Sequence, residues 1–357
     1  MRPLIRNAVL GAVVVIVGVS GFVGAWVLKP APASGSSSTL WVVAAGSLAP
    51  ILPSFAATFT SETPGVSDPL SAQLYEGSTA AASSLAGGHQ PYDVFLAADF
   101  RTIPQDIEGP APSVASWEVV FASDPVVLAY APSVSALSGI GPTNWWTKIT
   151  QTGVLLGVPN ASSDPLGTNA IFTLELQDAA AGLSGALYGH FFTGSEGALA
   201  GLTSSTRYVS ENVAGTALSE GEVDAFLLYR SYAVADHLAY VNLSESVDLG
   251  GITAGNVTSY SAVSTTVLSG TGTATKVEHG APVLFSLTVP STAQSAVLGL
   301  AFADFLLSNA TAGTWSSYGF EPIAPEWTDH LAAVPAALSG SPPTGLAPLP
   351  SYLASLA

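Results

Sequence analysis

The chain has 357 residues, of which 48% are hydrophobic and only 9% are charged. This composition excludes an intrinsically disordered chain, because disorder requires low hydrophobicity and high charge. Eight basic residues against 25 acidic ones exclude general nucleic-acid binding, and the absence of cysteine excludes disulfides and thiolate metal sites.

The N-terminal segment is typical of a membrane-directed sequence. Arg2 and Arg6 precede an uncharged apolar stretch at 7–28, which is long enough to span a bilayer. Two interpretations stay open: a retained anchor with a cytoplasmic N-terminus, and a cleaved signal peptide. In both, residues 1–38 form an anchor or signal segment plus linker. We therefore expect the rest of the chain outside the cytoplasm, on the extracellular face of the membrane or secreted.

Short apolar runs alternate with helical patterns along the exported chain. Strands are predicted at 40–45, 74–75, 92–97, 125–130, 154–158, 224–229 and 282–289. Helices are predicted at 50–59, 79–86, 169–181, 212–219 and 293–307. This alternation is typical of the α/β class with a parallel sheet. The Pro- and Ala-rich residues 331–357 are predicted to form a loosely ordered tail.

Recognisable catalytic motifs are missing. The sequence has no nucleophile elbow, P-loop or dinucleotide fingerprint, and no two of its five histidines have metal-ligand spacing. We therefore expect no catalytic residues, no zinc site and no cofactor. Ser47 and Ser78 each follow a glycine near a strand end and precede a helix. Such serines are either helix caps or part of an anion site, because the first N–H groups of a helix are unpaired.

Several segments, in order, resemble archaeal tungstate/molybdate solute-binding proteins. These segments are VVAAGSLAPILPSFAATF, YEGSTAAASSLAGGHQPYDVFLAADFRTIP, GVPNASSDPLGTNAIFTLELQ, GEVDAFLLYRSYAVADHLAYVNL, VLFSLTVPSTAQSAVLGLAFADFLLS and YGFEPIAP. The resemblance covers about residues 40–325 and implies a two-lobed type II periplasmic-binding-protein fold. Lobe 1 would be discontinuous, at 39–124 and 283–330, with lobe 2 at 125–282 between its two parts.

The resemblance also implies five ligand-binding residues. Ser47 in A-G-S-L and Ser78 in the next G-S turn match serines of the family's first lobe. Asp164 in the D-P-x-G loop and Glu211 match acids of the second lobe, although the segment before Glu211 lacks the family's basic run. Tyr229 matches a ligand-contacting tyrosine of related molybdate binders.

These residue types suit a tetrahedral dianion with a metal centre. Serine hydroxyls and backbone N–H groups donate to its oxygens. Carboxylates beside a dianion are repelled unless they bind the W(VI) or Mo(VI) centre, which can expand to six oxygen ligands. The resemblance implies that Asp164 and Glu211 ligate that metal centre, and this arrangement would also exclude sulfate. The resemblance implies a monomer that captures tungstate or molybdate and delivers it to the membrane permease of an ABC importer.

Other interpretations stay open. Asp164 is also an ordinary turn residue before Pro, Glu211 an ordinary acid at a helix start, and Tyr229 an ordinary buried aromatic. The ligand could instead be sulfate or phosphate, or the protein could be a surface glycoprotein with a degenerate site. Four N-x-[ST] sequons fit a glycosylated exterior, although each arises readily by chance; they lie at Asn160, Asn242, Asn256 and Asn309.

Overall fold

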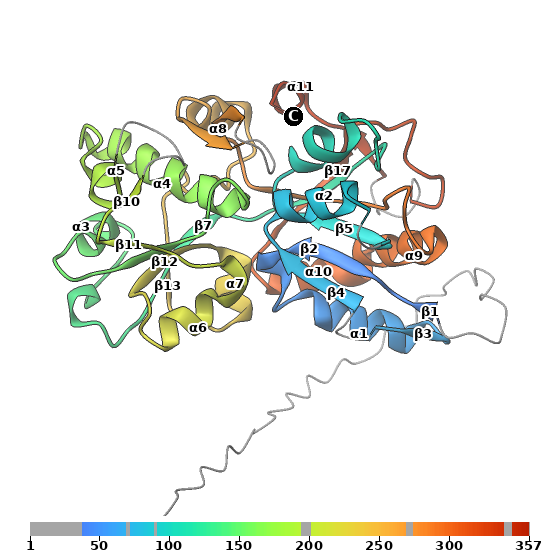
Figure 1. Cartoon of the computed structure of the whole chain (residues 1–357), viewed down its shortest axis with the longest axis horizontal. Coiled ribbons are helices and arrows are strands. Elements are labelled where there is room, and N and C mark those ends of the chain that lie inside the picture. Colours follow the sequence, from blue (N-terminus) through green and yellow to red (C-terminus); the bar gives the residue numbers. More distant parts are fainter. Residues whose placement is uncertain are drawn as a thin grey trace, which may run out of the picture. The chain divides into compact units, whose positions relative to one another are not determined.

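The computed structural model describes residues 38–68, 72–88, 91–193, 201–268, 274–338 and 345–356. These residues belong to one compact unit, which contains two larger β-sheets flanked by helices (Figure 1). The predicted anchor or signal segment lies outside the described residues. Among the described residues no single helix is long and apolar enough to cross a membrane. One pair of consecutive helices, Ala296–Leu306 and Asn309–Ser317, is together long and apolar enough, but the two helices are bent by 65° relative to each other.

The larger sheet has seven strands in the order β18-β17-β6-β16-β5-β2-β4. Their bounds are β2 (Val42–Ala45), β4 (Gln73–Glu76), β5 (Val94–Ala97), β6 (Val119–Ser123), β16 (Leu284–Thr288), β17 (Glu321–Thr328) and β18 (Ala347–Pro348). The central strands β2, β5, β6 and β16 are buried along their whole length. This burial explains why they read as continuous apolar runs rather than as alternating patterns.

Helices cover both faces of the seven-stranded sheet. Alternate residues of β5 belong to different hydrophobic clusters, because successive side chains of a strand point to opposite faces. One face packs against α1 (Leu52–Glu62) and α9 (Ala296–Leu306), where Phe59 contacts Phe302 with ring centroids 5.1 Å apart. The other face packs against α2 (Ser78–Ala86) and a helical turn, η3 (Ile103–Glu108).

The second sheet has five strands in the order β11-β8-β12-β7-β13. Their bounds are β7 (Val126–Tyr130), β8 (Leu156–Val158), β11 (Thr206–Tyr208), β12 (Ala225–Tyr229) and β13 (Tyr240–Asn242). Its helices are α3 (Trp145–Ile149), α4 (Pro165–Ala181), α5 (Ala186–Phe191), α6 (Ala214–Ser219) and α7 (Arg230–Ala235). In Figure 1 these elements lie to the left of the seven-stranded sheet.

The chain leaves the seven-stranded sheet after β6 and returns to it at β16. The prediction of a parallel sheet is therefore only partly right. Strand β2 pairs in parallel with β4 and β5, but β16 runs antiparallel to β5 and β6, and β12 runs antiparallel to β7. Strands β17 and β13 also pair antiparallel, with β6 and β7, so the antiparallel pairs involve the strands on both sides of the direct connection from β6 to β7.

Smaller elements complete the described part of the chain. They are β1 (Ser38–Thr39), β3 (Val66–Ser67), β9 (Phe192–Thr193), β10 (Gly201–Leu202), β14 (Ser264–Leu268), β15 (Thr275–His279), α8 (Ala254–Tyr260), α10 (Asn309–Ser317) and α11 (Ser351–Ala354). Strands β14 and β15 form an antiparallel hairpin.

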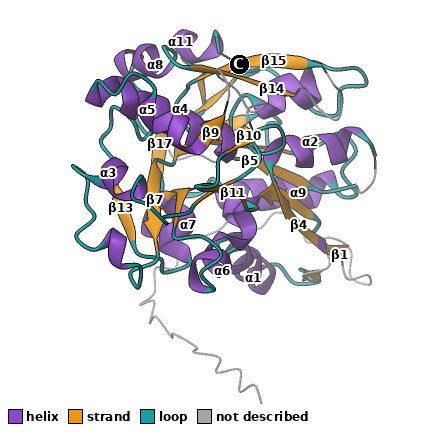
Figure 2. Cartoon of the chain, turned by 60° about the vertical axis from the view of Figure 1, so that its left-hand side comes forward, coloured by secondary structure: helices purple, strands orange, loops and turns teal. Residues whose placement is uncertain are grey.

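The C-terminal segment corrects the prediction of a loosely ordered tail. Strand β18 pairs with β17, and the N–H of Leu349 donates to the carbonyl of Thr328 at 2.8 Å. Leu349 and Leu353 are buried in a cluster that includes Phe100. Helix α11 lies beside α8 in both views (Figures 1 and 2), and the Tyr352 hydroxyl donates to the carbonyl of Ile252 at 3.1 Å. Two buried leucines, strand pairing and hydrogen bonds therefore hold the described part of this Pro- and Ala-rich segment.

Candidate ligand-binding site

Ser47 lies in a tight turn at the carboxyl end of β2. The turn, η1 (Gly46–Leu48), buries the serine fully, and its Oγ has no hydrogen-bond partner. A Cβ at Gly46 would lie 3.1 Å from Oε2 of Glu211, so glycine allows the turn to approach that acid closely. An unpartnered buried hydroxyl at the end of a sheet strand is a common feature of a ligand site.

Ser78 is the first residue of α2 and is also fully buried. Its Oγ accepts a hydrogen bond from the N–H of Ala98, at the end of β5, over 2.9 Å. Because the hydroxyl accepts this bond, its own proton remains available to a ligand. A Cβ at Gly77 would overlap the carbonyl oxygen of Ser163 and lie 2.9 Å from Cα and Cβ of Asp164. Glycine is therefore required where the two sheets meet here.

The two predicted acids come from the five-stranded side. Asp164 precedes α4 and caps it, with its Oδ1 accepting from the N–H of Leu166 at 2.9 Å. Glu211 begins a short turn, η5 (Glu211–Val213), and is 1% exposed. Neither carboxylate oxygen of Glu211 has a hydrogen-bond partner. Asp164 is thus also a residue before proline at a helix start and Glu211 also an acid at the start of a helical turn, so both ordinary interpretations stay open, but neither supplies a partner for the oxygens of Glu211.

Burial and proximity raise the pKa values of both acids. Burial raises the pKa of Asp164 to about 7, against a smaller lowering effect of the Leu166 N–H. Burial, and then the charge of Asp164, raise the pKa of Glu211 well above its usual range. Ser47 lies close enough to Glu211 to lower the pKa of that acid in part, although the geometry of Ser47 Oγ is not that of a full hydrogen bond. Two ionised carboxylates are therefore unfavourable here, and binding of a proton or of an electrophilic centre stabilises the pair.

Tyr229 ends strand β12 and is fully buried. Its hydroxyl accepts a hydrogen bond from Nδ2 of Asn169 at 2.9 Å, and its ring stands edge-on to Phe285 of β16 at 5.6 Å. Burial, and then the charges of Glu211 and Asp164, raise the pKa of the tyrosine far above its usual range. Tyr229 therefore stays neutral and can donate its proton to an anion.

The structure brings the five predicted residues together between the two sheets. Gly46, the neighbour of Ser47, lies close to Glu211, and Gly77, the neighbour of Ser78, lies close to Asp164. Tyr229 interacts electrostatically with both acids. The contact between the sides continues through Asn212, whose Nδ2 donates to the carbonyl of Tyr75 at 3.4 Å. A cavity of about 300 Å³ adjoins the site at Gly77 and Asp164. The arrangement offers hydroxyl donors and two carboxylates to one small ligand.

Two features of the site were not predicted. Asn169 donates a hydrogen bond to the hydroxyl of Tyr229. The sequence could have indicated this residue, because Asn169 lies in the segment GVPNASSDPLGTNAIFTLELQ with Asp164 and on the helix that Asp164 caps. The tight approaches at Gly46 and Gly77 depend on both sheets at once and have no sequence signal. Arg230, next to Tyr229, forms an ion pair with Glu321 at 2.9 Å.

Sequence comparisons agree on one family. Residues 40–321 match the family model described as bacterial extracellular solute-binding protein. An uncharacterized solute-binding protein of Methanoculleus marisnigri is 26% identical over 265 residues, which are 70% of this chain and 72% of that protein. The molybdate/tungstate-binding proteins WtpA of Pyrococcus abyssi and Thermococcus kodakarensis are each 24% identical, over 60% and 65% of this chain and 64% and 66% of their own lengths.

Structural comparisons agree on the fold. The periplasmic molybdate-binding protein of Azotobacter vinelandii matches with a TM-score of 0.52 at 14% identity, covering 80% of this chain and 99% of that one. Peb3 from Campylobacter jejuni matches with a TM-score of 0.50 at 9% identity, covering 79% of this chain and 99% of its own. At these identities the similarity supports the two-lobed α/β architecture of periplasmic binding proteins and says nothing of the ligand.

Proposed function

Because the chain belongs to the bacterial extracellular solute-binding protein family, we propose that it captures tungstate or molybdate and delivers the anion to the membrane permease of an ABC importer. The family and fold are those of solute-binding transport proteins, not of enzymes. Attachment to the membrane through residues 7–28, and action as a monomer, are parts of this proposal. A tether would keep the binding protein close to the permease and raise its effective concentration there.

One observation carries the choice of ligand. Glu211 is buried with both carboxylate oxygens unpartnered, beside the unpartnered hydroxyl of Ser47. Leaving such groups unpaired costs about 1–3 kcal/mol each, so a ligand that satisfies both at once gains that free energy. Such a ligand offers acceptor oxygens to the hydroxyl and either an electrophilic centre or a hydrogen-bond donor to the carboxylate. Tungstate and molybdate offer both.

The same pair of acids argues against sulfate. Sulfate has two charges and no proton at neutral pH, and its sulfur does not readily accept further oxygen ligands. When ionised, Asp164 and Glu211 would therefore repel it without a compensating bond. Hydrogen phosphate is the stronger competitor, because its remaining proton could be donated to an unpartnered oxygen of Glu211.

Capture requires the two sheets to move relative to each other. Ser47, Ser78, Glu211 and Tyr229 are at most 1% exposed, and of the five residues only Asp164 lines the adjoining cavity, so a ligand cannot reach the whole set in the form described. We propose that the site opens by hinge motion and that the anion, through contacts with both sides, favours the closed form. The approaches of Gly46 to Glu211 and of Gly77 to Asp164 would be contacts of that closed form.

Calorimetric titration of the full-length chain, in a mild detergent, tests the proposal. Tungstate, molybdate, hydrogen phosphate and sulfate are compared on the wild type and on the Ser47→Ala variant. We expect tight, saturable binding of the first two ions, weakened at least tenfold by the substitution. Tighter binding of phosphate or sulfate than of tungstate would retain the family and refute the ligand. No heat with any of the four would favour a surface protein with a degenerate site.

A further inference from the structure

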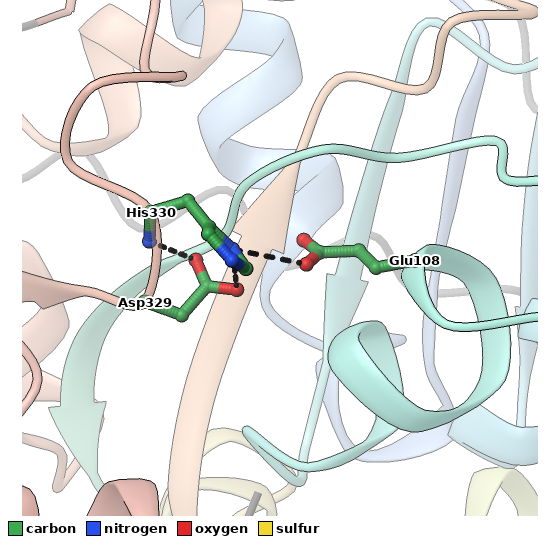
Figure 3. A group of neighbouring side chains, drawn as sticks. All are labelled: Glu108, Asp329 and His330. Atoms are coloured by element: carbon green, nitrogen blue, oxygen red, sulfur yellow. Dashed lines mark hydrogen bonds and ion pairs between the residues drawn. The ribbon is translucent and has the colours of Figure 1, made fainter.

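A second group of polar side chains lies on the seven-stranded side and shares no residue with the candidate ligand site (Figure 3). Glu108 ends the helical turn η3, and Asp329 and His330 directly follow β17. Figure 3 shows the three side chains directed toward one another. The Nδ1 of His330 lies 2.8 Å from Oδ2 of Asp329 and 3.4 Å from Oε2 of Glu108.

The acids of this group are buried, and several of their oxygens have no partner. The side chains of Glu108 and Asp329 are 9% and 10% exposed, and Oε1 of Glu108 makes no hydrogen bond. Glu118 is fully buried close by, with neither carboxylate oxygen partnered, and its backbone N–H donates to Oδ1 of Asp329 at 2.9 Å. Three carboxyl groups therefore gather where water can solvate little of them.

The described part of the chain supplies these acids with no lysine or arginine. Each of its five basic side chains has another partner: Arg101 has Asp99, Lys276 has Glu278, Arg207 has Glu222, Arg230 has Glu321 and Lys148 has the carbonyl of Ser138. His330, even when protonated, offsets one charge of three. Burial, and then the neighbouring Asp329, raise the pKa of Glu108 to about 8. Burial, and then Asp329, raise the pKa of Glu118 well above its usual range.

The spacing of the three side chains matches a metal-ion site. Ligand atoms about 2.1 Å from one ion lie about 3.0 Å apart in octahedral and about 3.4 Å apart in tetrahedral geometry. The two distances from His330 Nδ1, 2.8 and 3.4 Å, fall near this range. The His330 side chain is 62% exposed, which leaves room for water as a further ligand. One imidazole with carboxylates is a donor set for zinc and similar ions, whereas calcium prefers oxygen alone.

We propose that Glu108, Asp329 and His330 bind one divalent transition-metal ion of the zinc type. The N–H of Glu118 orients Asp329 from behind, as groups next to metal ligands commonly do. The ion would join the end of η3 to the end of β17, and so fix the point from which the C-terminal segment continues to β18. The expectation of no zinc site rested on histidine spacing, which cannot reveal ligands so far apart in the sequence.

The test is metal binding by the full-length chain after treatment with a chelator. ZnCl2 and CaCl2 are titrated separately by calorimetry, and CoCl2 is added to record the visible spectrum of any bound cobalt. The variants are Glu108→Gln, which keeps the side-chain shape, and His330→Ala. His237→Ala is the matched control, because Asp236-His237 repeats the Asp-His pair of this site on the other side of the molecule.

We expect one zinc ion per chain, binding at least tenfold tighter than calcium. Both Glu108→Gln and His330→Ala should weaken zinc binding at least tenfold and abolish the cobalt spectrum, while His237→Ala changes neither. Circular dichroism identifies a variant that fails to fold, and the other variant then decides. Absence of saturable zinc binding, calcium binding as tight as zinc, or zinc binding unaffected by both substitutions would overturn the proposal.

Discussion

Replacing Glu211 by glutamine is expected to stabilise the free protein while it weakens tungstate binding. Glu211 is 1% exposed and both of its oxygens lack a hydrogen-bond partner. Burial and the charge of Asp164 both oppose its ionisation, so at pH 8 the folded state must keep a proton there or hold a poorly solvated charge. An amide of the same shape has neither cost. We expect the free energy of unfolding at pH 8 to rise by about 1–3 kcal/mol.

The effect on binding has the opposite sign. If the carboxylate of Glu211 ligates the metal centre, an amide loses that bond, and we expect the Kd for tungstate to rise at least 100-fold, or about 2.7 kcal/mol. Calorimetry measures the affinity, and urea denaturation without ligand measures the stability. Glu222→Gln is the matched control, because Glu222 is about half exposed and only 3.8 Å from Arg207, an exposed pair worth little. A Glu211→Gln variant that binds tungstate as the wild type does, or that is less stable at pH 8, would refute the reasoning.

Three further predictions concern pH, the seam between the sheets and the C-terminal segment. Burial raises the pKa values of Asp164 and Asp124 from 3.8 to about 7, so the folded state holds protons that the unfolded state releases. This stability is complete below about pH 4 and is lost as the pH rises through about 7. Urea denaturation should therefore give a higher free energy of unfolding at pH 4.5 than at pH 8, and the reverse order would contradict this assignment. Gly77→Ala places a methyl group against the Ser163 carbonyl and should weaken tungstate binding at least tenfold without changing the circular dichroism. The control Gly141→Ala, whose added Cβ would have nothing within 4 Å, should leave tungstate affinity unchanged. Equal affinities of the two variants would show that the close approach at Gly77 is unimportant. Leu353→Ala removes a fully buried side chain and should lower the free energy of unfolding, measured by urea denaturation, by about 2–4 kcal/mol. Leu331→Ala, at a residue that is 45% exposed, should lower it by less than about 0.5 kcal/mol. Similar losses for the two variants would mean that α11 does not anchor the tail.

Much of the fold could be predicted because buried strands are short apolar runs. The runs that contain β2, β5 and β12 were identified to within two residues, each followed by polar or small residues. Strand β6 (Val119–Ser123) is equally apolar and was not predicted; Asp124-Pro125 separates it from β7, and each of the two strands joins a different sheet. Strand direction was the harder property, since an apolar run does not show whether its neighbour is parallel or antiparallel.

The five residues of the candidate site stay a prediction that rests on the resemblance, and their energetics have no sequence signal. Only Ser47 and Ser78, each near a strand end and a helix start, could also be singled out from the sequence pattern. That Glu211 has no partner for either oxygen depends on a turn from the other sheet and is visible only in three dimensions. The same holds for Glu108 and His330, which lie far apart in the sequence and meet only in the folded chain.

The most direct measurement of the central claim is anomalous diffraction at the tungsten edge from crystals of the full-length chain grown with tungstate. We predict one strong tungsten peak between the two sheets, within direct bonding distance of carboxylate oxygens from both Asp164 and Glu211. The hydroxyls of Ser47, Ser78 and Tyr229 should lie around the remaining oxygens. A tungsten peak elsewhere, or an anion held in this site by the hydroxyls with the two carboxylates turned away, would contradict it.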